Sequence, residues 1–85
     1  ESMPAGVAAY PNPVINKVEI NIDSRYKAGN DLILFDLPGR IYKPKSVKKL
    51  SDNSFEVDLT GLEKGVYFIK IKLNDSYKTF RIIKL

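Results

Sequence analysis

Alternation of apolar and polar residues is the dominant pattern of this chain. It runs from Lys17 to Ile22, returns from Phe55 to Leu59, and is longest from Tyr67 to Leu73. A period of two is typical of strands that bury one face. No segment places apolar residues at helical spacing over a useful length, so the sequence predicts almost no helix.

A second group of strands is less regular. Leu32–Phe35 is apolar at successive positions, which indicates a central strand covered on both faces or a strand at a twisted corner. Asp36–Gly39 should end it in a hairpin, because Pro38 cannot donate to a ladder and Gly39 tolerates a positive φ. The return strand runs from about Arg40 into Tyr42. Pro44 interrupts it and favours an edge or a bulge, where the following lysines would discourage pairing with another chain.

The end of the chain reads as one more hairpin. Asn74 and Asp75 form a tight turn, after which Phe80 and Ile82 alternate with polar residues and Ile83 breaks the pattern, so both faces of the last strand should be partly covered. Six or seven short strands at spacings of roughly 8 to 12 residues predict an antiparallel sandwich. We therefore expect an all-β, immunoglobulin-like fold of about seven strands without a disulfide, because the chain has no cysteine.

The segment between two of these strands has the pattern of a tyrosine corner. Leu62, Gly65 and Tyr67 form L-x-x-G-x-Y just before the longest alternating run. In two-sheet proteins such a tyrosine buries its ring and hydrogen bonds to the backbone a few residues upstream. The alternative is that Tyr67 is an ordinary half-buried strand aromatic.

The N-terminal residues are organised differently. Residues 1–9 are small and weakly polar, and indicate a linker or a loosely attached first strand, followed by a sandwich domain at 10–85. Pro11, Asn12 and Pro13 predict a rigid turn, or simply the end of a proline-rich linker. No run is long enough to span a membrane, and no signal-peptide pattern is present.

Charge is unevenly distributed along these 85 residues. The formal net charge is +4, and the whole excess lies beyond residue 64, where Lys70, Lys72, Lys78, Arg81 and Lys84 face Asp75 alone. A basic face can attract phosphate or anionic lipid head groups, although it is more often only a solvated face.

Residues for catalysis are largely missing. The chain has no histidine and no cysteine, so the usual general base, soft metal ligands and thiol nucleophile are absent. The carboxylates match no calcium loop, and we expect no enzyme activity, metal or cofactor. Phe68, on the same outward face as Lys70 and Lys72, could form a stacking platform, but one exposed aromatic and a modest charge argue against a nucleic-acid partner.

Four segments in order resemble a known family. They are YPNPV, LILFDLPGR, FEVDLTGLEKGVYFIKI and FRIIKL, which together span roughly Tyr10 to Leu85. They resemble the C-terminal sorting domain, type A, of type IX secretion cargo proteins in Bacteroidetes. Two departures are Leu37-Pro38, where the family usually has small polar residues, and Arg81, where it more often has lysine.

The resemblance implies a non-catalytic transport signal attached to an N-terminal cargo domain. Such a domain is recognised by the outer-membrane translocon and removed by a sortase, here in or just before Met3 to Ala9. The cargo would pass through the periplasm to the outer membrane, the cell surface or the medium. The implied recognition residues are Gly65, Tyr67, Arg81, Ile82, Ile83, Lys84 and Leu85, and the implied structural motif residues are Pro11, Asn12, Pro13, Asp36, Gly39 and Leu62.

Alternatives remain open at this point. Gly65 and Tyr67 could be needed only for folding, whereas an exposed Lys84 would have less structural purpose. A basic terminal strand with a free edge suits strand addition to a receptor, and also self-association through edge or terminal strands. A different function is that of a sandwich module binding carbohydrate or a surface partner, for which Phe68 and Tyr42 are the candidate aromatics.

Overall fold

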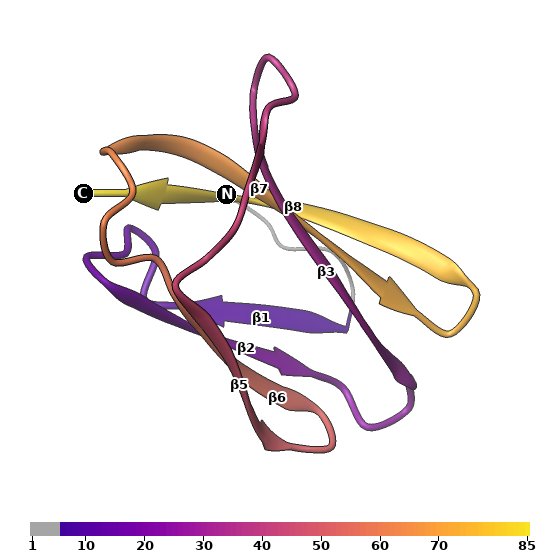
Figure 1. The fold of residues 1–85 in the computed structure, drawn as a ribbon. Helices are drawn as coiled ribbons and strands as arrows, with labels where there is room; N and C mark the ends of the chain where they lie inside the picture. The colour runs from indigo at the N-terminus through magenta and orange to yellow at the C-terminus, as the bar shows by residue number, and fades with distance from the viewer. Residues whose placement is uncertain (1–5) are drawn as a thin grey trace.

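Within residues 6–85, eight strands form two antiparallel sheets of four, stacked as a sandwich (Figure 1). The computed structural model describes residues 6–85, and the side chains at 29–31 lie outside that description. The strands are β1 (Val7–Tyr10), β2 (Lys17–Ile22), β3 (Ala28–Asp36), β4 (Ile41–Tyr42), β5 (Ser46–Ser51), β6 (Ser54–Asp58), β7 (Gly65–Leu73) and β8 (Ser76–Lys84). One sheet has the order β1-β2-β6-β5 and the other β4-β3-β7-β8. The predicted all-β sandwich is confirmed.

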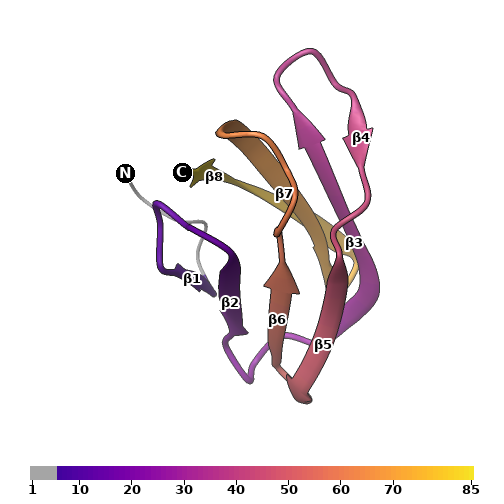
Figure 2. The same cartoon turned by 60° about the vertical axis from the view of Figure 1, so that its left-hand side comes forward.

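The strand count differs from the prediction because the return strand after Gly39 is two strands. β4 pairs with β3 in one sheet, whereas β5 pairs with β6 in the other, as Figure 2 shows. Pro44 lies between them, where the chain crosses from one sheet to the other, and the N–H of Lys45 already donates to the carbonyl of Asp58 (2.8 Å). Proline has no N–H for a ladder, so it ends the first strand. The predicted edge position of β4 is confirmed.

The core lies between the sheets and consists of the inward residues of the alternating strands. On β7 the inward residues Tyr67, Ile69, Ile71 and Leu73 are all at most 5% exposed, as the period of two predicted. Fully burying an aliphatic side chain is worth about 1.5 to 3 kcal/mol. The remaining core members are Val7, Val14, Val18, Ile20, Ile22, Leu34, Phe55, Val57, Leu59, Phe80 and Ile82.

β3 is a central strand, but only one of its faces is fully covered. Leu34 points inward and is 1% exposed, whereas Ile33 on the outer face is 36% exposed. Phe35 is half-buried because its ring stacks on Phe68 of β7, with centroids 5.5 Å apart. The apolar run at 32–35 therefore reflects an apolar outer surface of this sheet.

The inward face of β8 corrects one expectation. Lys84 follows Phe80 and Ile82 on that face and is only 8% exposed, so the prediction of an exposed Lys84 is wrong. Its aliphatic stem lies at the end of the core, and its amine donates to the carbonyl of Leu85 (2.9 Å). Ile83 on the opposite face is half-buried, which confirms partial cover of both faces.

The first strand is short and lies at the edge of its sheet. β1 pairs with β2 from Val7↔Ile22 to Tyr10↔Glu19. Gly6, just before it, has φ +85° and faces the ring of Tyr26, which leaves no room for a side chain. Residues 1–5, part of the segment expected to be a linker, lie outside the described residues.

The structure contains no helix within residues 6–85, and so none that is long and apolar enough to cross a membrane.

Candidate functional site

Residues of the predicted recognition motif meet at one end of the β7–β8 hairpin. The register pairs Gly65 with Lys84, Val66 with Ile83, and Tyr67 with Ile82. The two halves of the motif are thus cross-strand neighbours. Gly65 has φ +155°, a backbone conformation that favours glycine. A Cβ at this position would meet nothing within 4 Å, so the conformation and not a lack of space explains the glycine. Leu85 follows β8 and is 61% exposed.

Tyr67 forms the predicted corner. Its ring is 5% exposed, and its hydroxyl donates to the carbonyl of Glu63 at 2.7 Å. Leu62 packs against the core, and its N–H donates to the carbonyl of Leu59 at 3.1 Å, which closes the turn before β7. Burial raises the pKa of Tyr67 above its ordinary value, and the nearby Glu63 adds to that rise. The corner fixes the point at which β7 enters its sheet.

The Pro11-Asn12-Pro13 turn contacts the C-terminal strand directly. The Asn12 amide nitrogen donates to the carbonyl of Arg81, and its amide oxygen accepts from the N–H of Ile83, each at 3.0 Å. Both prolines follow cis peptide bonds. The asparagine side chain thus fills the place that a neighbouring strand would take beside β8.

The residue after this turn continues the same contact. The N–H of Val14 donates to the carbonyl of Ile83 (2.7 Å), and the N–H of Leu85 donates to the carbonyl of Val14 (2.8 Å). Val14 and Lys84 form a parallel bridge. We name residues 12–14 the covering segment, because they occupy the outer edge of β8 from Arg81 to Leu85. The edge predicted to be available there is occupied.

Sequence reasoning found the proline turn but missed this contact. The only local signal is chemical: an asparagine carboxamide carries the same donor and acceptor as a peptide group. The partners are separated by 69 and 71 residues, so no short-range pattern could connect them.

Asp36 organises the predicted β3–β4 hairpin from a buried position. It is 7% exposed, and its carbonyl accepts from the N–H of Gly39 (2.9 Å), which has φ +95°. Its carboxylate accepts from the backbone N–H of Arg40 (2.8 Å), from Arg40 Nε (2.8 Å) and from the hydroxyl of Tyr42 (2.7 Å). The hairpin forms with Pro38 in it, and Arg40 and Tyr42 are members that the motif did not reveal.

The electrostatics of Asp36 follow from these contacts. Burial alone raises the pKa of this carboxyl group, but the hydrogen bonds from Tyr42 and Arg40 and the guanidinium charge outweigh it and hold the pKa below the ordinary value. Tyr42 also meets Tyr67 edge to face, with ring centroids 5.3 Å apart. The Asp36 hairpin and the Tyr67 corner are therefore one connected unit.

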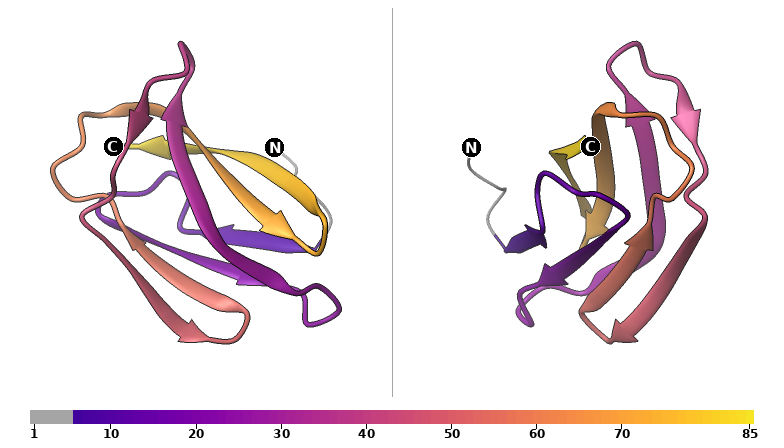
Figure 3. Two further views of the ribbon diagram at one scale, coloured as in Figure 1. Left: turned by 45° about the vertical axis from the view of Figure 1, so that its right-hand side comes forward. Right: turned by 90° about the vertical axis from the view of Figure 1, so that its left-hand side faces the viewer.

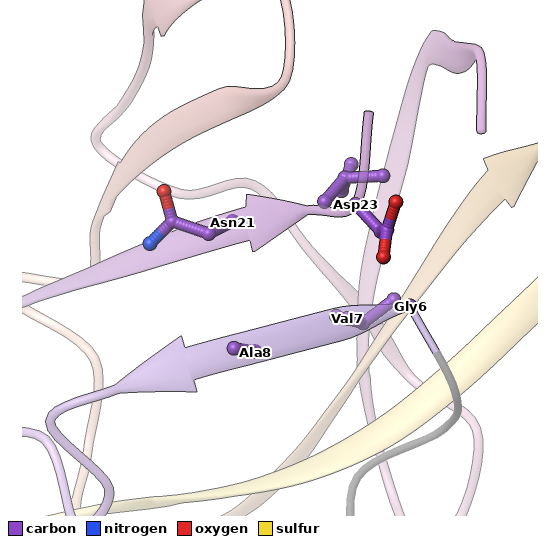
Figure 4. Close-up of a pocket in the computed structure, with 6 residues that line it drawn as sticks. Gly6, Val7, Ala8, Asn21 and Asp23 are labelled. Carbon is purple, nitrogen blue, oxygen red and sulfur yellow. The ribbon is translucent and has the colours of Figure 1, made fainter. Parts of the chain in front are cut away.

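Two hollows lie among the described residues, and the lining of neither contains a group for catalysis that is not already paired or exposed to solvent. One, of about 300 Å³, lies where the hairpin meets the corner and is lined by Arg40, Tyr42, Gly61, Leu62, Glu63 and Tyr67. The other, of about 360 Å³, lies between β1 and the end of β2 (Figure 4), where Asp23 is already paired with Arg25 at 3.0 Å. Within the described part of the chain no three acidic side chains lie together as metal ligands would.

The candidate carbohydrate-binding aromatics are engaged with other rings. Tyr42 packs on Tyr67 and donates its hydroxyl to Asp36, while Phe68 stacks on Phe35 at an interplanar angle of 22°. A sugar platform needs a free planar face. The two rings therefore give the carbohydrate alternative no support.

Comparison with known proteins identifies the family. The family model of the secretion system C-terminal sorting domain matches residues 8–85. The chain belongs to this family. The sorting domain is a type IX secretion signal of cargo proteins, and it directs them across the outer membrane to the cell surface or the medium. The family is not known for catalysis, and its members act with the type IX machinery and an N-terminal cargo part.

No curated protein and no solved structure gave a match.

Proposed function

We propose that the type IX translocon recognises the sorting domain at the end of the β7–β8 hairpin, through Gly65, Tyr67 and residues 81–85. One observation carries the proposal: the register places Gly65 beside Lys84 and Tyr67 beside Ile82, so residues far apart in the sequence form one surface feature. The covering segment then fixes the position of the last strand.

The roles within this end differ. Ile82 and Tyr67 are buried and shape the site, whereas Arg81 and Leu85 are exposed and can contact a partner directly. Strand addition beside Ile83 requires displacement of Val14, which already bonds there. We therefore expect recognition to use side chains and the exposed end of the hairpin, with strand addition only after the covering segment has moved.

The boundaries of the signal are part of the same proposal. Residues 10–85 form the sorting unit, residues 1–9 are a linker or loosely attached first strand that connects it to the cargo, and the sortase cuts in or just before Met3 to Ala9. A cut before Val7 would leave every described strand complete. The cargo would reach the machinery from the periplasm.

The test uses a reporter fused to residues 1–85, which keep all of β1, in a bacterium with a type IX system. The fusion should appear at the cell surface, and deletion of residues 82–85 should stop its export. A periplasmic reporter with the full signal, or continued export after the deletion, would contradict the proposal.

A matched pair of variants separates recognition from folding. Leu85→Ser and Leu50→Ser each alter an exposed leucine, with exposed fractions of 61% and 44%. Both proteins should keep the wild-type denaturation curve, and only Leu85→Ser should reduce export. Equal export of the two variants would show that Leu85 is not read.

A further inference from the structure

The outer face of the β4-β3-β7-β8 sheet is apolar. Its outward side chains alternate with the buried ones, so Ile41 lies beside Phe35, Phe35 beside Phe68, and Val66 beside Ile83. Several are well exposed: Ile41 by 76%, Val66 by 42% and Ile33 by 36%. We name this set the apolar face: Ile33, Phe35, Ile41, Val66, Phe68 and Ile83.

The outer face of the other sheet has the opposite character. Tyr10 donates to Glu19, Asn21 donates to both, and Ser54 donates to Asn21. Lys17 and Glu56 form an ion pair at 3.8 Å on the same side. Water satisfies such a surface, whereas contiguous apolar side chains on one side of a small domain mark an interaction site.

Cations lie on the same face as the apolar residues. Lys70 and Lys72 follow Phe68 on β7, and their amines lie 4.7 and 5.9 Å from the centre of the Tyr77 ring on β8. Among the strand residues whose side chains the structure describes, none of the outward ones on this face is a carboxylate; Asp75 lies in the turn between β7 and β8, and positions 29–31 lie outside that description. The excess positive charge of the chain is thus largely adjacent to an exposed apolar surface.

The β3–β4 turn extends this surface outward. It projects past the neighbouring strand ends (Figures 2 and 3), and it bears Leu37, which is 80% exposed, while Ile41, 76% exposed, follows the turn at the start of β4. The turn is held in place by the hydrogen bonds to Asp36. Two exposed aliphatic side chains are therefore presented on a fixed support, which lowers the entropy cost of binding.

We infer that the apolar face and the β3–β4 turn lie against a membrane surface that carries anionic head groups. Aliphatic side chains would enter the boundary between head groups and acyl chains, Tyr77 would lie at its level, and Lys70 and Lys72 would reach lipid phosphates. A second copy of the chain fits less well, because it would bring the same lysines. The described strand residues of its outer face include no carboxylate that could pair with those lysines. The six residues of the apolar face carry no side-chain donor or acceptor to fix the register of a protein partner, and the polar residues beside them on β8, Thr79 and Arg81, supply no carboxylate.

Membrane contact is independent of which residues the translocon reads. It would hold a cargo at the outer membrane, so that the cargo would search for the translocon in two dimensions. Each lysine near an anionic surface should contribute on the order of a fivefold gain in binding.

Co-sedimentation of the 85-residue chain with vesicles tests the inference. The protein should bind vesicles of phosphatidylethanolamine with phosphatidylglycerol, bind phosphatidylcholine vesicles at least about fivefold more weakly, and lose binding as salt rises. Lys70→Gln with Lys72→Gln should weaken binding by on the order of tenfold or more. Leu37→Ser with Ile41→Thr should weaken it by a similar factor.

Matched controls lie on the other sheet. Val47→Thr with Leu50→Ser changes two exposed aliphatic residues of β5, and Lys48→Gln with Lys49→Gln removes two exposed lysines of the same strand, away from the apolar face. Each control should bind at least about fivefold more tightly than its counterpart on the apolar face. Equal binding to neutral and anionic vesicles, or equal loss in control and test variants, would overturn the inference. Loss of export in the test variants without any vesicle binding would overturn it in favour of a protein partner.

Discussion

β5 and β8 hold the same position in the fold, yet they are built differently. Each is the last strand of a four-stranded sheet. All six residues of β5 are exposed, and its pairing with β6 contains a register shift between Lys49 and Ser51. β8 instead buries Phe80, Ile82 and Lys84, and pairs with β7 in one unbroken register from Leu73↔Ser76 to Gly65↔Lys84.

The two strands also protect their outer edges in different ways. β5 carries Lys48 and Lys49, whose charge discourages another strand from pairing. β8 is covered near its end by Asn12 and Val14. Charge protects an edge without fixing its conformation, whereas a covering segment does both. The strand that carries the proposed recognition residues is thus the one that the rest of the domain holds in place.

The largest predicted difference is between core residues of β8 and side chains of β5. Ile82→Ala should reduce the free energy of unfolding by about 2 to 5 kcal/mol, because Ile82 is completely buried and a cavity would remain. Val47→Ala on β5 should cost about 0.5 kcal/mol or less, since Val47 is 46% exposed. Urea denaturation measures both, and similar costs would remove the contrast.

Next in size is the effect of the corner that sets β7 beside β8. Tyr67→Phe should destabilise the domain by about 1 to 2 kcal/mol, because the carbonyl of Glu63 would lose its partner in a part-buried setting. Tyr77→Phe is the control, because that side chain is 50% exposed. Chemical denaturation should show a shift for the first variant only, and a neutral Tyr67→Phe would show that the hydroxyl is not needed.

A smaller effect should come from uncovering the edge of β8. Asn12→Ala removes the hydrogen bonds to Arg81 and Ile83, at a cost of about 1 kcal/mol in an exposed setting. Hydrogen exchange should accelerate at the amides of Ile83 and Leu85, while Asn12→Asp keeps the acceptor for Ile83 and should preserve more of its protection. Unchanged exchange in Asn12→Ala would mean that Val14 alone holds the edge.

The smallest effect concerns the hairpin from which the chain crosses to β5. The pKa of Asp36 is lower in the folded protein than the ordinary value of about 3.9, so its stabilisation is present above that pH and is lost as the pH falls through the folded pKa. Asp36→Asn should therefore lose less stability than the wild type between about pH 6 and about pH 3. Denaturation at several pH values measures this, and parallel curves would contradict it.

A variant of Tyr42 tests the cause of that shift. Tyr42→Phe removes one hydrogen bond to the Asp36 carboxylate, so the pKa of Asp36 should rise toward its ordinary value. The acid-induced loss of stability should then lie between those of the wild type and Asp36→Asn. A Tyr42→Phe curve identical to the wild type would assign the shift to Arg40 alone.

Much of this contrast could be predicted from the sequence, because strand periodicity is local. The alternation from Tyr67 to Leu73 and the Asn74-Asp75 turn predicted the β7–β8 hairpin, and the structure has both. The Tyr67 hydrogen bond was also predictable, since its acceptor lies only four residues upstream. The alternating segments thus gave the core and one corner of the site.

The remaining features depend on contacts between distant segments. A lysine near the end of a strand looks exposed in the sequence, and only the inward phase of β8 shows that Lys84 is buried. The exposed pattern of β5 has no period, so its separation from β4 follows only from its pairing with β6. The hydrogen bonds from Asn12 to β8 form only when the fold has brought together residues 69 and 71 positions apart in the sequence.

The covering segment has a consequence for the order of events in folding. Val14 is completely buried and bonds to Ile83 and Leu85, so the first turn of the sandwich is completed by the last residues of the sequence. Because contacts between such distant residues close a large loop at an entropic cost, we expect them to form late. A chain that ends before Ile83 would leave Val14 without its partners and this side of the sandwich unfinished. We therefore expect the domain to reach its final shape only when residues 83–85 are present, so that a truncated signal would be structurally distinct from an intact one.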